Sequence, residues 1–251
     1  MIGDPSPLLK RERAAEKTQR LWDKIEVTYT PRRWRMLEDY RAVALAVLRD
    51  LDRFGVNAFI HGSLARGDVD AQSDIDIVVP DITMSRDIEI ILTVSSYKIY
   101  SRQISQATPS HALKGHIFLD PARKISVTFP LLSFRRLEYE FYRFGGLLDL
   151  KGVVRGDRTA GCTKKLTLVE PTETGHLESG IVGREAEIAR ILGVSPEIVK
   201  ERERVLARRD EIGRTGVFLK RELIGDESFQ KYMKSLIDSN PAVRRAYLMR
   251  R

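Results

Sequence analysis

The chain has 251 residues, of which 42% are hydrophobic, so it can bury a substantial core, and we expect two closely packed domains. Forty-three Lys and Arg against 35 Asp and Glu leave a net charge of +8, which suits a polyanionic partner as well as it suits a generally charged surface. The single cysteine, Cys162, excludes an intramolecular disulfide and a cysteine-based metal cluster. The apolar runs fall far short of the roughly 20 residues that span a bilayer. We therefore expect a soluble, cytoplasmic protein without a membrane partner.

The N-terminal part of the chain predicts two helices. Residues 1–29 open with Pro and Gly and then become strongly charged, which indicates a frayed start and an amphipathic helical extension. A firmer helix is expected to begin after Thr30 as N-cap, with Pro31 in the first helical position, and to end at Gly55.

Strands are predicted on both sides of a connection rich in Gly and Asp. Residues 56–61 and 75–79 fit two short buried strands, and residues 62–73 join them. Residues 85–94 fit a helix and a strand equally well. Alternating apolar and polar residues predict three further strands, at 98–104, 116–119 and 125–129, with a hairpin connection at 121–123.

The rest of the chain divides into a β-rich and a helical part. Residues 137–182 are rich in Gly and Thr with short apolar runs, which is typical of a small β-rich segment, and from residue 183 the pattern becomes helical. We therefore expect an α/β (α+β) domain over 30–136 with a mixed sheet flanked by helices, a β-rich connecting segment over 137–182 and a C-terminal helical domain over 183–251.

The richest motif runs from Phe59 to Val79 and reads FIHGSLARGDVDAQSDIDIVV. Asp74 and Asp76 are two apart on a predicted strand, so both carboxylates face one side and can share divalent cations. Two like charges this close repel unless a cation lies between them. An oxygen-rich setting without sulfur favours Mg²⁺, with Mn²⁺ as the alternative ion.

The residues before the carboxylates are suited to phosphate. Gly62 lets a phosphate approach the backbone without a Cβ in the way, and Ser63 and its amide can hold phosphate oxygens where a helix is expected to start. Arg66 is a candidate to neutralise charge on a triphosphate. The alternative is that Gly62 and Gly67 only shape turns and that the two aspartates form a solvated strand end.

This stretch resembles the signature of the DNA polymerase beta nucleotidyltransferase superfamily, in which a hydrophobic residue and Gly-Ser are followed about ten residues later by Asp-hydrophobic-Asp-hydrophobic. The variant here, with Gly-Ser-x-Ala-Arg-Gly and Ser-Asp-Ile-Asp, is similar to minimal and archaeal nucleotidyltransferases. The resemblance implies a nucleotidyltransferase fold in which Gly62 and Ser63 bind a nucleoside triphosphate and Asp74 and Asp76 bind magnesium.

One part of the family pattern is missing. The family normally adds a third carboxylate on a later strand, and the corresponding strand here, residues 124–130, carries no acid, with Ser126 or Val127 at the expected position. Asp120 is the nearest candidate replacement, and its alternative role is that of an ordinary turn residue before Pro121. His61 is expected to be a strand residue flanking the site rather than a metal ligand.

Residues 185–209 resemble a helix-turn-helix. A short helix ends at Gly193, and Ser195-Pro196 can start the next, which would be the recognition helix. Four basic side chains on this second helix could reach phosphates of RNA or DNA, although glutamates interrupt them: Lys200, Arg202, Arg204 and Arg208. The alternative is a packed helical pair that braces the site, and residues 214–219 could form a wing-like strand after it.

These observations predict transfer of a nucleoside monophosphate from a nucleoside triphosphate to an acceptor hydroxyl, with Mg²⁺ and with pyrophosphate leaving. Charge and the helix-turn-helix pattern favour a nucleic-acid end as acceptor, while a protein hydroxyl or a small molecule remains open. A rival prediction is a non-catalytic nucleotide sensor that binds nucleic acid on the same fold, supported by the missing third acid.

Overall fold

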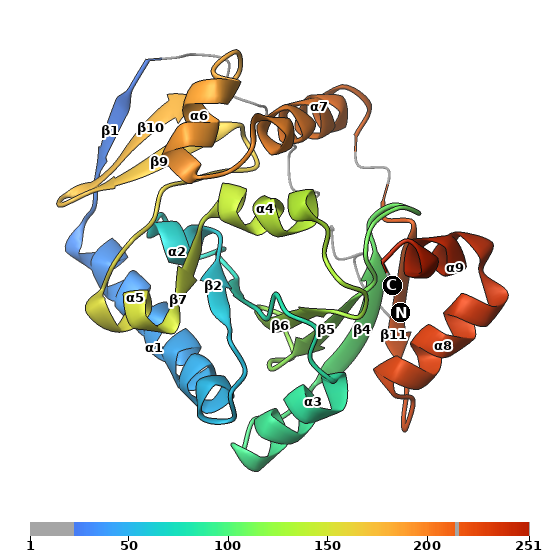
Figure 1. Cartoon of the computed structure of the whole chain (residues 1–251). Coiled ribbons are helices and arrows are strands. Elements are labelled where there is room, and N and C mark those ends of the chain that lie inside the picture. Colours follow the sequence, from blue (N-terminus) through green and yellow to red (C-terminus); the bar gives the residue numbers. More distant parts are fainter. Residues whose placement is uncertain (1–22, 214–215, 251) are drawn as a thin grey trace, which may run out of the picture.

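The computed structural model describes residues 23–213 and 216–250, and its largest element is a seven-stranded sheet (Figure 1). The strand order is β11-β4-β5-β6-β3-β2-β7. In that order the strands are Leu219–Leu223, Ser101–Gln106, Lys114–Phe118, Ile125–Pro130, Ile75–Val78, Phe59–His61 and Leu147–Asp149. Strands β3 and β6 run parallel and the other neighbours antiparallel, so the sheet is mixed, as predicted.

Helix α1 (Pro31–Arg53) begins as its sequence predicts. The Thr30 side chain accepts a hydrogen bond from the amide of Arg33, and Pro31 occupies the first turn, where its missing N–H is not needed. Its buried stripe, which includes Ala44 and Leu48, packs on the sheet residues Ile60 and Ile77 in the main core. The helix thus covers one face of the sheet at the strands β2 and β3, which carry the motif.

Besides the short helix α2 (Ser63–Arg66), which buries Leu64 and Ala65, four more helices in the described part of the chain contribute buried residues to this main core. They are α3 (Ser85–Val94), α5 (Leu150–Arg155), α8 (Phe229–Ser239) and α9 (Pro241–Leu248). The ambiguous segment 85–94 is therefore a helix, because Ile88, Ile91 and Leu92 recur at helical spacing and are buried together. No helix in the described part of the chain has both the length and the apolar character needed to cross a membrane.

The other sheet face is polar along β3, β5 and β6, and helix α4 (Arg136–Gly145) packs on part of it. The Tyr142 ring lies edge-on to the His61 ring at 5.2 Å, and the Lys114 ammonium donates a hydrogen bond to the Tyr142 hydroxyl. The prediction that segment 137–182 is β-rich is wrong for its first part, where helices α4 and α5 stand on either side of β7. The reason is that Glu138, Tyr142 and Phe144 are buried at helical spacing.

A second, four-stranded sheet has the order β1-β10-β9-β8. Its strands are Ile25–Thr28, Gly175–Gly180, Thr167–Thr172 and Gly161–Cys162. The end of the predicted helical extension is therefore a strand, while residues 1–22 lie outside the described residues. A hydrogen bond of 2.7 Å between the Tyr29 hydroxyl and Nδ1 of buried His176 joins β10 to the start of α1. Pairing with β10 overrides the helical pattern that the charges suggested.

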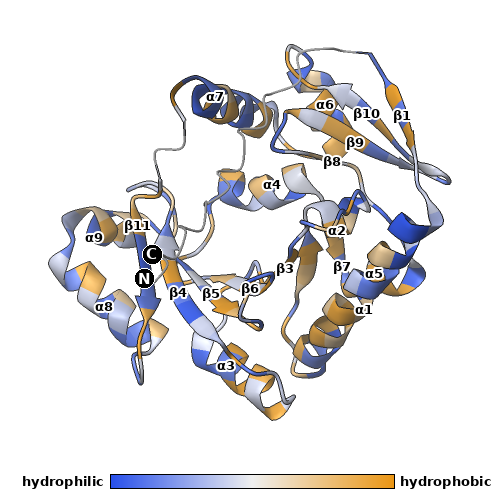
Figure 2. Ribbon diagram, turned by 180° about the vertical axis from the view of Figure 1, so that it is seen from behind, coloured by the Kyte–Doolittle hydropathy of each residue, from blue (hydrophilic) through white to orange (hydrophobic). Residues whose placement is uncertain are grey.

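Helices α6 (Glu185–Leu192) and α7 (Pro196–Ile212) pack with α4 and the small sheet around a second core. Gly193 has the left-handed φ of 61° that ends α6, and Ile188 and Val199 are buried between the elements. Figure 2 shows that the residues of α7 are mostly hydrophilic, whereas α1 mixes hydrophobic and hydrophilic residues. The two predicted helices and their turn are present.

The chain then returns to the main sheet. Residues 214–215 lie outside the described residues, but β11 pairs antiparallel with β4 instead of forming a wing beside α7. Phe229, Val243 and Ala246 then join the main core. The predicted C-terminal domain, residues 183–251, is thus divided between the two cores.

Candidate functional site

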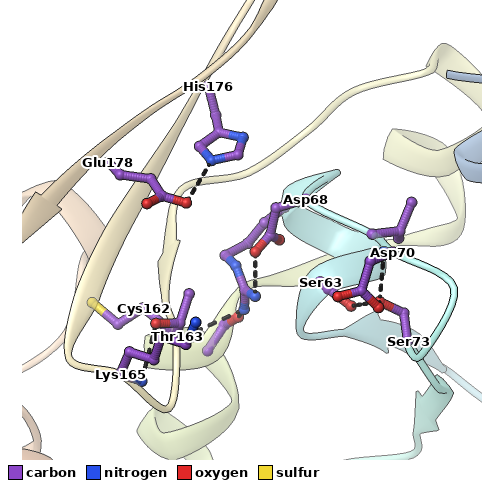
Figure 3. A network of polar contacts seen from close by, with 12 residues as sticks. Ser63, Asp68, Asp70, Ser73, Cys162, Thr163, Lys165, His176 and Glu178 are labelled. Carbon is purple, nitrogen blue, oxygen red and sulfur yellow. Dashed lines mark hydrogen bonds and ion pairs between the residues drawn. The ribbon is translucent and has the colours of Figure 1, made fainter. Parts of the chain in front are cut away.

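The turn after β2 has a backbone that requires glycine. Gly62 has φ 74° and ψ −141°, and a Cβ there would meet no atom within 4 Å, so the backbone angle rather than a clash selects glycine. The four-residue helix α2 (Ser63–Arg66) starts directly after it. The Ser63 hydroxyl donates to Ser73 Oγ at 3.2 Å, and Asp70 accepts from Ser73 (Figure 3). These bonds hold the turn against the start of β3.

Asp74 and Asp76 lie at the start of β3, beside this turn. Asp76 is opposite His61 in the antiparallel pair of β2 and β3, whereas Ile75 and Ile77 are buried in the main core. The alternation of the strand places half-buried Asp76 on the polar face. The same alternation extended one residue back puts exposed Asp74, which lies directly before the strand, on that face. The sequence prediction that they share a face agrees with this arrangement.

Burial raises the pKa of Asp76, and a hydrogen bond from Ser126 and the positive charge of Lys164 oppose that shift. The Ser126 hydroxyl donates to Asp76 Oδ1 at 2.9 Å. A half-buried carboxylate with a raised pKa is stabilised by a nearby cation. The donor set, two carboxylates and a hydroxyl, consists of hard oxygens and fits Mg²⁺, which is commonly held by one or two carboxylates together with substrate phosphates.

Of the two positions at which the resemblance predicted a third carboxylate, Val127 is buried in the main core and Ser126 lies on the polar face. Ser126 lies opposite Asp76 in the parallel pair of β3 and β6. Within the described residues no group of three or more His, Cys, Asp and Glu side chains is arranged to hold a metal ion. Asp74 and Asp76 are therefore not joined by a third acidic, histidine or cysteine ligand among the described residues.

Asp120 acts as a turn residue. Its Oδ2 accepts from the Ala122 amide at 3.0 Å and its Oδ1 accepts from the Ile125 amide at 2.7 Å, which closes the hairpin between β5 and β6. Both oxygens are thus committed to backbone amides, and this geometry supports the alternative role stated above rather than a catalytic one.

Arg66 faces the interior, contrary to the expectation that it contacts a triphosphate. It is 6% exposed, and it forms an ion pair of 2.9 Å with Asp68 while donating to the carbonyls of Gly145 and Cys162. These contacts tie α2 to α4 and to β8. The guanidinium cannot turn outward without leaving these buried partners unpaired, which explains the difference.

His61 is a strand residue beside the site, as expected. Burial and the nearby charge of Arg66 lower its pKa to about 4, so the ring is neutral at physiological pH. Its Nδ1 lies 3.0 Å from the Gly146 carbonyl oxygen, and a Cβ on Gly145 would come within 2.4 Å of the ring. The ring therefore fixes the turn between α4 and β7.

A turn of the small sheet carries two lysines that the sequence motif did not identify as candidate site residues. Lys164 and Lys165 are exposed in the turn between β8 and β9, where the Lys165 amide donates to Thr163 Oγ1 at 3.1 Å (Figure 3). Lys164 is the cation that acts on Asp76. The sequence offered only a pair of adjacent lysines as a signal, because nothing local places residue 164 near residue 76.

The four basic residues of α7 are not equivalent. Lys200, Arg204 and Arg208 are exposed and four residues apart, so they form one stripe on the helix. Arg202 instead lies 5.0 Å above the Phe141 ring of α4, where burial lowers its pKa to about 10. Arg202 therefore packs α7 on α4, and only the other three are available to a partner.

Residues 43–80 match the model of a protein family described as the nucleotidyltransferase domain. The match runs from the second half of α1 to the end of β3 and contains the Gly62 turn and both aspartates. No curated protein and no solved structure matches the chain. The match supports assignment of this chain to the nucleotidyltransferase superfamily.

Proposed function

We propose that the protein transfers a nucleoside monophosphate from a nucleoside triphosphate to an acceptor hydroxyl, using Mg²⁺ or Mn²⁺, and that it belongs to the polymerase beta type of the superfamily. The observation that carries this proposal is the position of Asp76 on the polar face of β3 and of Asp74 directly before that strand, next to the Gly62-Ser63 turn. A nucleotide needs both features at once, because its phosphates approach the backbone while its metal ions require carboxylates.

Each part has a defined role in the proposed reaction. Gly62 and Ser63 hold triphosphate oxygens, Asp74 and Asp76 hold the divalent ions, and Lys164 adds positive charge beside Asp76. When bound, the ions would stabilise the negative charge of the attacking and leaving oxygens. The bond from the acceptor oxygen to the α-phosphorus forms as the bond to pyrophosphate breaks, and the hydroxyl proton passes to water, since Ser126 stands where a carboxylate could have taken it.

A nucleic-acid end is the favoured acceptor. Its support is the stripe of Lys200, Arg204 and Arg208 on α7, together with the net charge of +8. Arg202 is not part of this surface because it packs on Phe141.

The rival proposal, a non-catalytic nucleotide sensor, is favoured by one observation. Ser126 donates to Asp76 at the place of the third carboxylate, so the general base of the family is replaced by a neutral hydroxyl. Two adjacent carboxylates, however, repel a triphosphate unless cations are bound, and a pure nucleotide binder gains little from keeping them.

The deciding experiment incubates the protein with each α-labelled nucleoside triphosphate, Mg²⁺ or Mn²⁺, and RNA, DNA or protein acceptors. We expect label transfer, and we expect Asp74→Ala and Asp76→Asn each to reduce it at least about 100-fold, because the ions lose a direct ligand. Asp81→Asn is the matched control, since Asp81 is an exposed acid just beyond the other end of β3.

The outcomes separate the two proposals. Nucleotide binding without transfer to any acceptor would establish the sensor. Transfer that survives both aspartate substitutions would show that the site has been assigned to the wrong residues.

A further inference from the structure

The sheet register aligns three side chains beside the candidate site. Asp76 of β3 is opposite Ser126 of β6, and Ser126 is opposite Phe118 of β5. All three share the polar face, because paired residues in a ladder point to the same side and Ser126 bonds Asp76 directly. Phe118 therefore lies two strands from Asp76, about 10 Å away at the usual strand spacing.

Phe118 has an aromatic neighbour and a cationic one. Its ring is stacked with that of His116, with centroids 6.4 Å apart and an interplanar angle of 18°. The guanidinium of exposed Arg123 lies 5.3 Å from the Phe118 ring centroid and pairs with Glu222 at 2.6 Å. His116 Nδ1 and Nε2 are held by Thr128 and Ser105, and burial helps to keep the ring neutral by lowering its pKa to about 4. Phe118 and His116 thus form a pair of neutral rings, which we call the platform. The Arg123 guanidinium lies over the Phe118 ring of this platform.

The two sides of the aspartates are chemically different. The Gly62-Ser63 turn lies at the end of β2, on one side of β3, whereas Phe118 and Arg123 lie beyond β6, on the other side. In an in-line displacement the leaving pyrophosphate and the attacking hydroxyl lie on opposite sides of the α-phosphorus. If the triphosphate occupies the β2 side, the acceptor enters from the side of β5.

We propose that Phe118 and Arg123 bind the 3′-terminal nucleotide of a single-stranded nucleic-acid acceptor, with its base on the Phe118 ring and its phosphate at the Arg123 guanidinium. This inference rests on the proposed function and assigns its acceptor class. The distance between Phe118 and Asp76 is one that a single nucleotide bridges from its base to its 3′ oxygen. Stacking on an aromatic ring and pairing with a guanidinium are the two interactions that single strands use most.

A protein hydroxyl fits this surface less well. A serine or threonine side chain has no planar group to place on the Phe118 ring, and it carries no phosphate for Arg123. Arg123 is also exposed, and its ion pair with Glu222 lies at the surface, where such a contact contributes little and is easily exchanged for a phosphate.

The test measures binding of the full chain to RNA and DNA oligonucleotides that carry the fluorescent base 2-aminopurine at the 3′ end or at an internal position. We expect the 3′-terminal probe to be quenched by stacking and the internal probe to change less. Phe118→Leu keeps an apolar side chain but removes the ring, so it should weaken binding at least about 5-fold and abolish the quench, whereas Phe118→Trp should retain both.

Controls separate stacking from folding and from charge. Phe54→Leu changes an exposed aromatic residue at the end of α1 and should leave binding and quenching unchanged. Arg123→Gln should reduce the dependence of binding on salt concentration while the terminal quench persists. Unfolding curves of each variant show whether the β5–β6 hairpin is intact, and the RNA and DNA arms show which sugar is preferred.

The proposal fails if the wild-type protein binds no oligonucleotide, if Phe118→Leu binds and quenches like the wild type, or if label goes to a protein acceptor and Phe118→Leu leaves that transfer unchanged. In the last case nucleotidyl transfer stands and only the acceptor class is wrong. A terminal quench that depends on Phe118 without any transfer would support the platform and contradict the enzyme.

Discussion

At the scale of single residues, burial decides which cations near the site are available to phosphate. Arg66 is inside, paired with Asp68 and bonded to two carbonyls, while Lys164 is exposed and acts on Asp76. Arg66 of the motif is therefore tied to buried partners, whereas the positive charge that acts on Asp76 belongs to exposed Lys164, about a hundred residues later.

This difference predicts opposite results for two substitutions. Arg66→Ala should lower the free energy of unfolding by about 3 kcal/mol or more, because it leaves the Asp68 carboxylate buried without its partner. Lys164→Ala should change stability by no more than about 0.5 kcal/mol but weaken triphosphate binding roughly 5-fold, as the loss of one exposed charge would. Urea unfolding and nucleotide titration of both variants check this. If Arg66→Ala instead lost as much nucleotide affinity as Lys164→Ala and kept its stability, Arg66 would be a phosphate-binding residue after all.

At the scale of elements, α7 has one packed side and one exposed basic side. One side packs on α4 through Arg202 and Phe141, and Glu140 of α4 accepts a hydrogen bond from the Ser195 hydroxyl at the start of α7. The other side carries the exposed stripe of Lys200, Arg204 and Arg208. A packed brace and a phosphate-binding surface can therefore coexist on one helix.

We expect the double charge reversal Lys200→Glu and Arg204→Glu to weaken binding of an oligonucleotide and to reduce the salt dependence of its association constant by about two phosphate contacts. Glu197→Lys, on the exposed start of the same helix, is a control of opposite sign and should strengthen binding. Fluorescence anisotropy at several salt concentrations measures both. Identical salt slopes for all three proteins would leave α7 as a brace alone.

At the scale of the whole molecule, the C-terminal end of the chain closes on α4. Arg250 donates to both oxygens of Glu138, and their side chains are only 3% and 7% exposed. Burial works against ionisation of Glu138, but amides of Arg135 and Ala112 and the guanidinium of Arg250 outweigh it and hold the pKa of this carboxyl below its usual range. One ion pair thus connects α9, in the main core, with the helix that also contacts the second core.

Arg250→Ala should lower the free energy of unfolding by about 3 to 5 kcal/mol at neutral pH, because a buried carboxylate loses its partner. The pKa of Glu138 is lowered in the folded protein. The stability that ionised Glu138 contributes in the wild type is therefore present above the ordinary glutamate pKa and is lost as the pH falls through the lower folded value. The difference in the free energy of unfolding between wild type and variant should therefore become smaller at acidic pH. The test is to measure the free energy of unfolding of both proteins at pH 7 and at pH 3. An equal difference between the two proteins at both pH values would contradict the prediction.

The sequence by itself determined the local features of the site. The turn at Gly62, the capped start of α1 and the shared face of Asp74 and Asp76 were predicted from glycine's freedom, capping and the period of a strand, which depend on neighbouring residues only. It also indicated the mixed sheet, the turn at Gly193 and the absence of an acid on β6.

Only the tertiary structure decided what lies around those features. Strand register put Ser126 and Phe118 in line with Asp76, the second core turned Arg66 and Arg202 inward, and the return of β11 to β4 removed the expected wing. These contacts join residues far apart in the chain, and no local pattern records which buried partners a charged side chain will meet. Packing, rather than residue type, therefore chose which basic groups face the site.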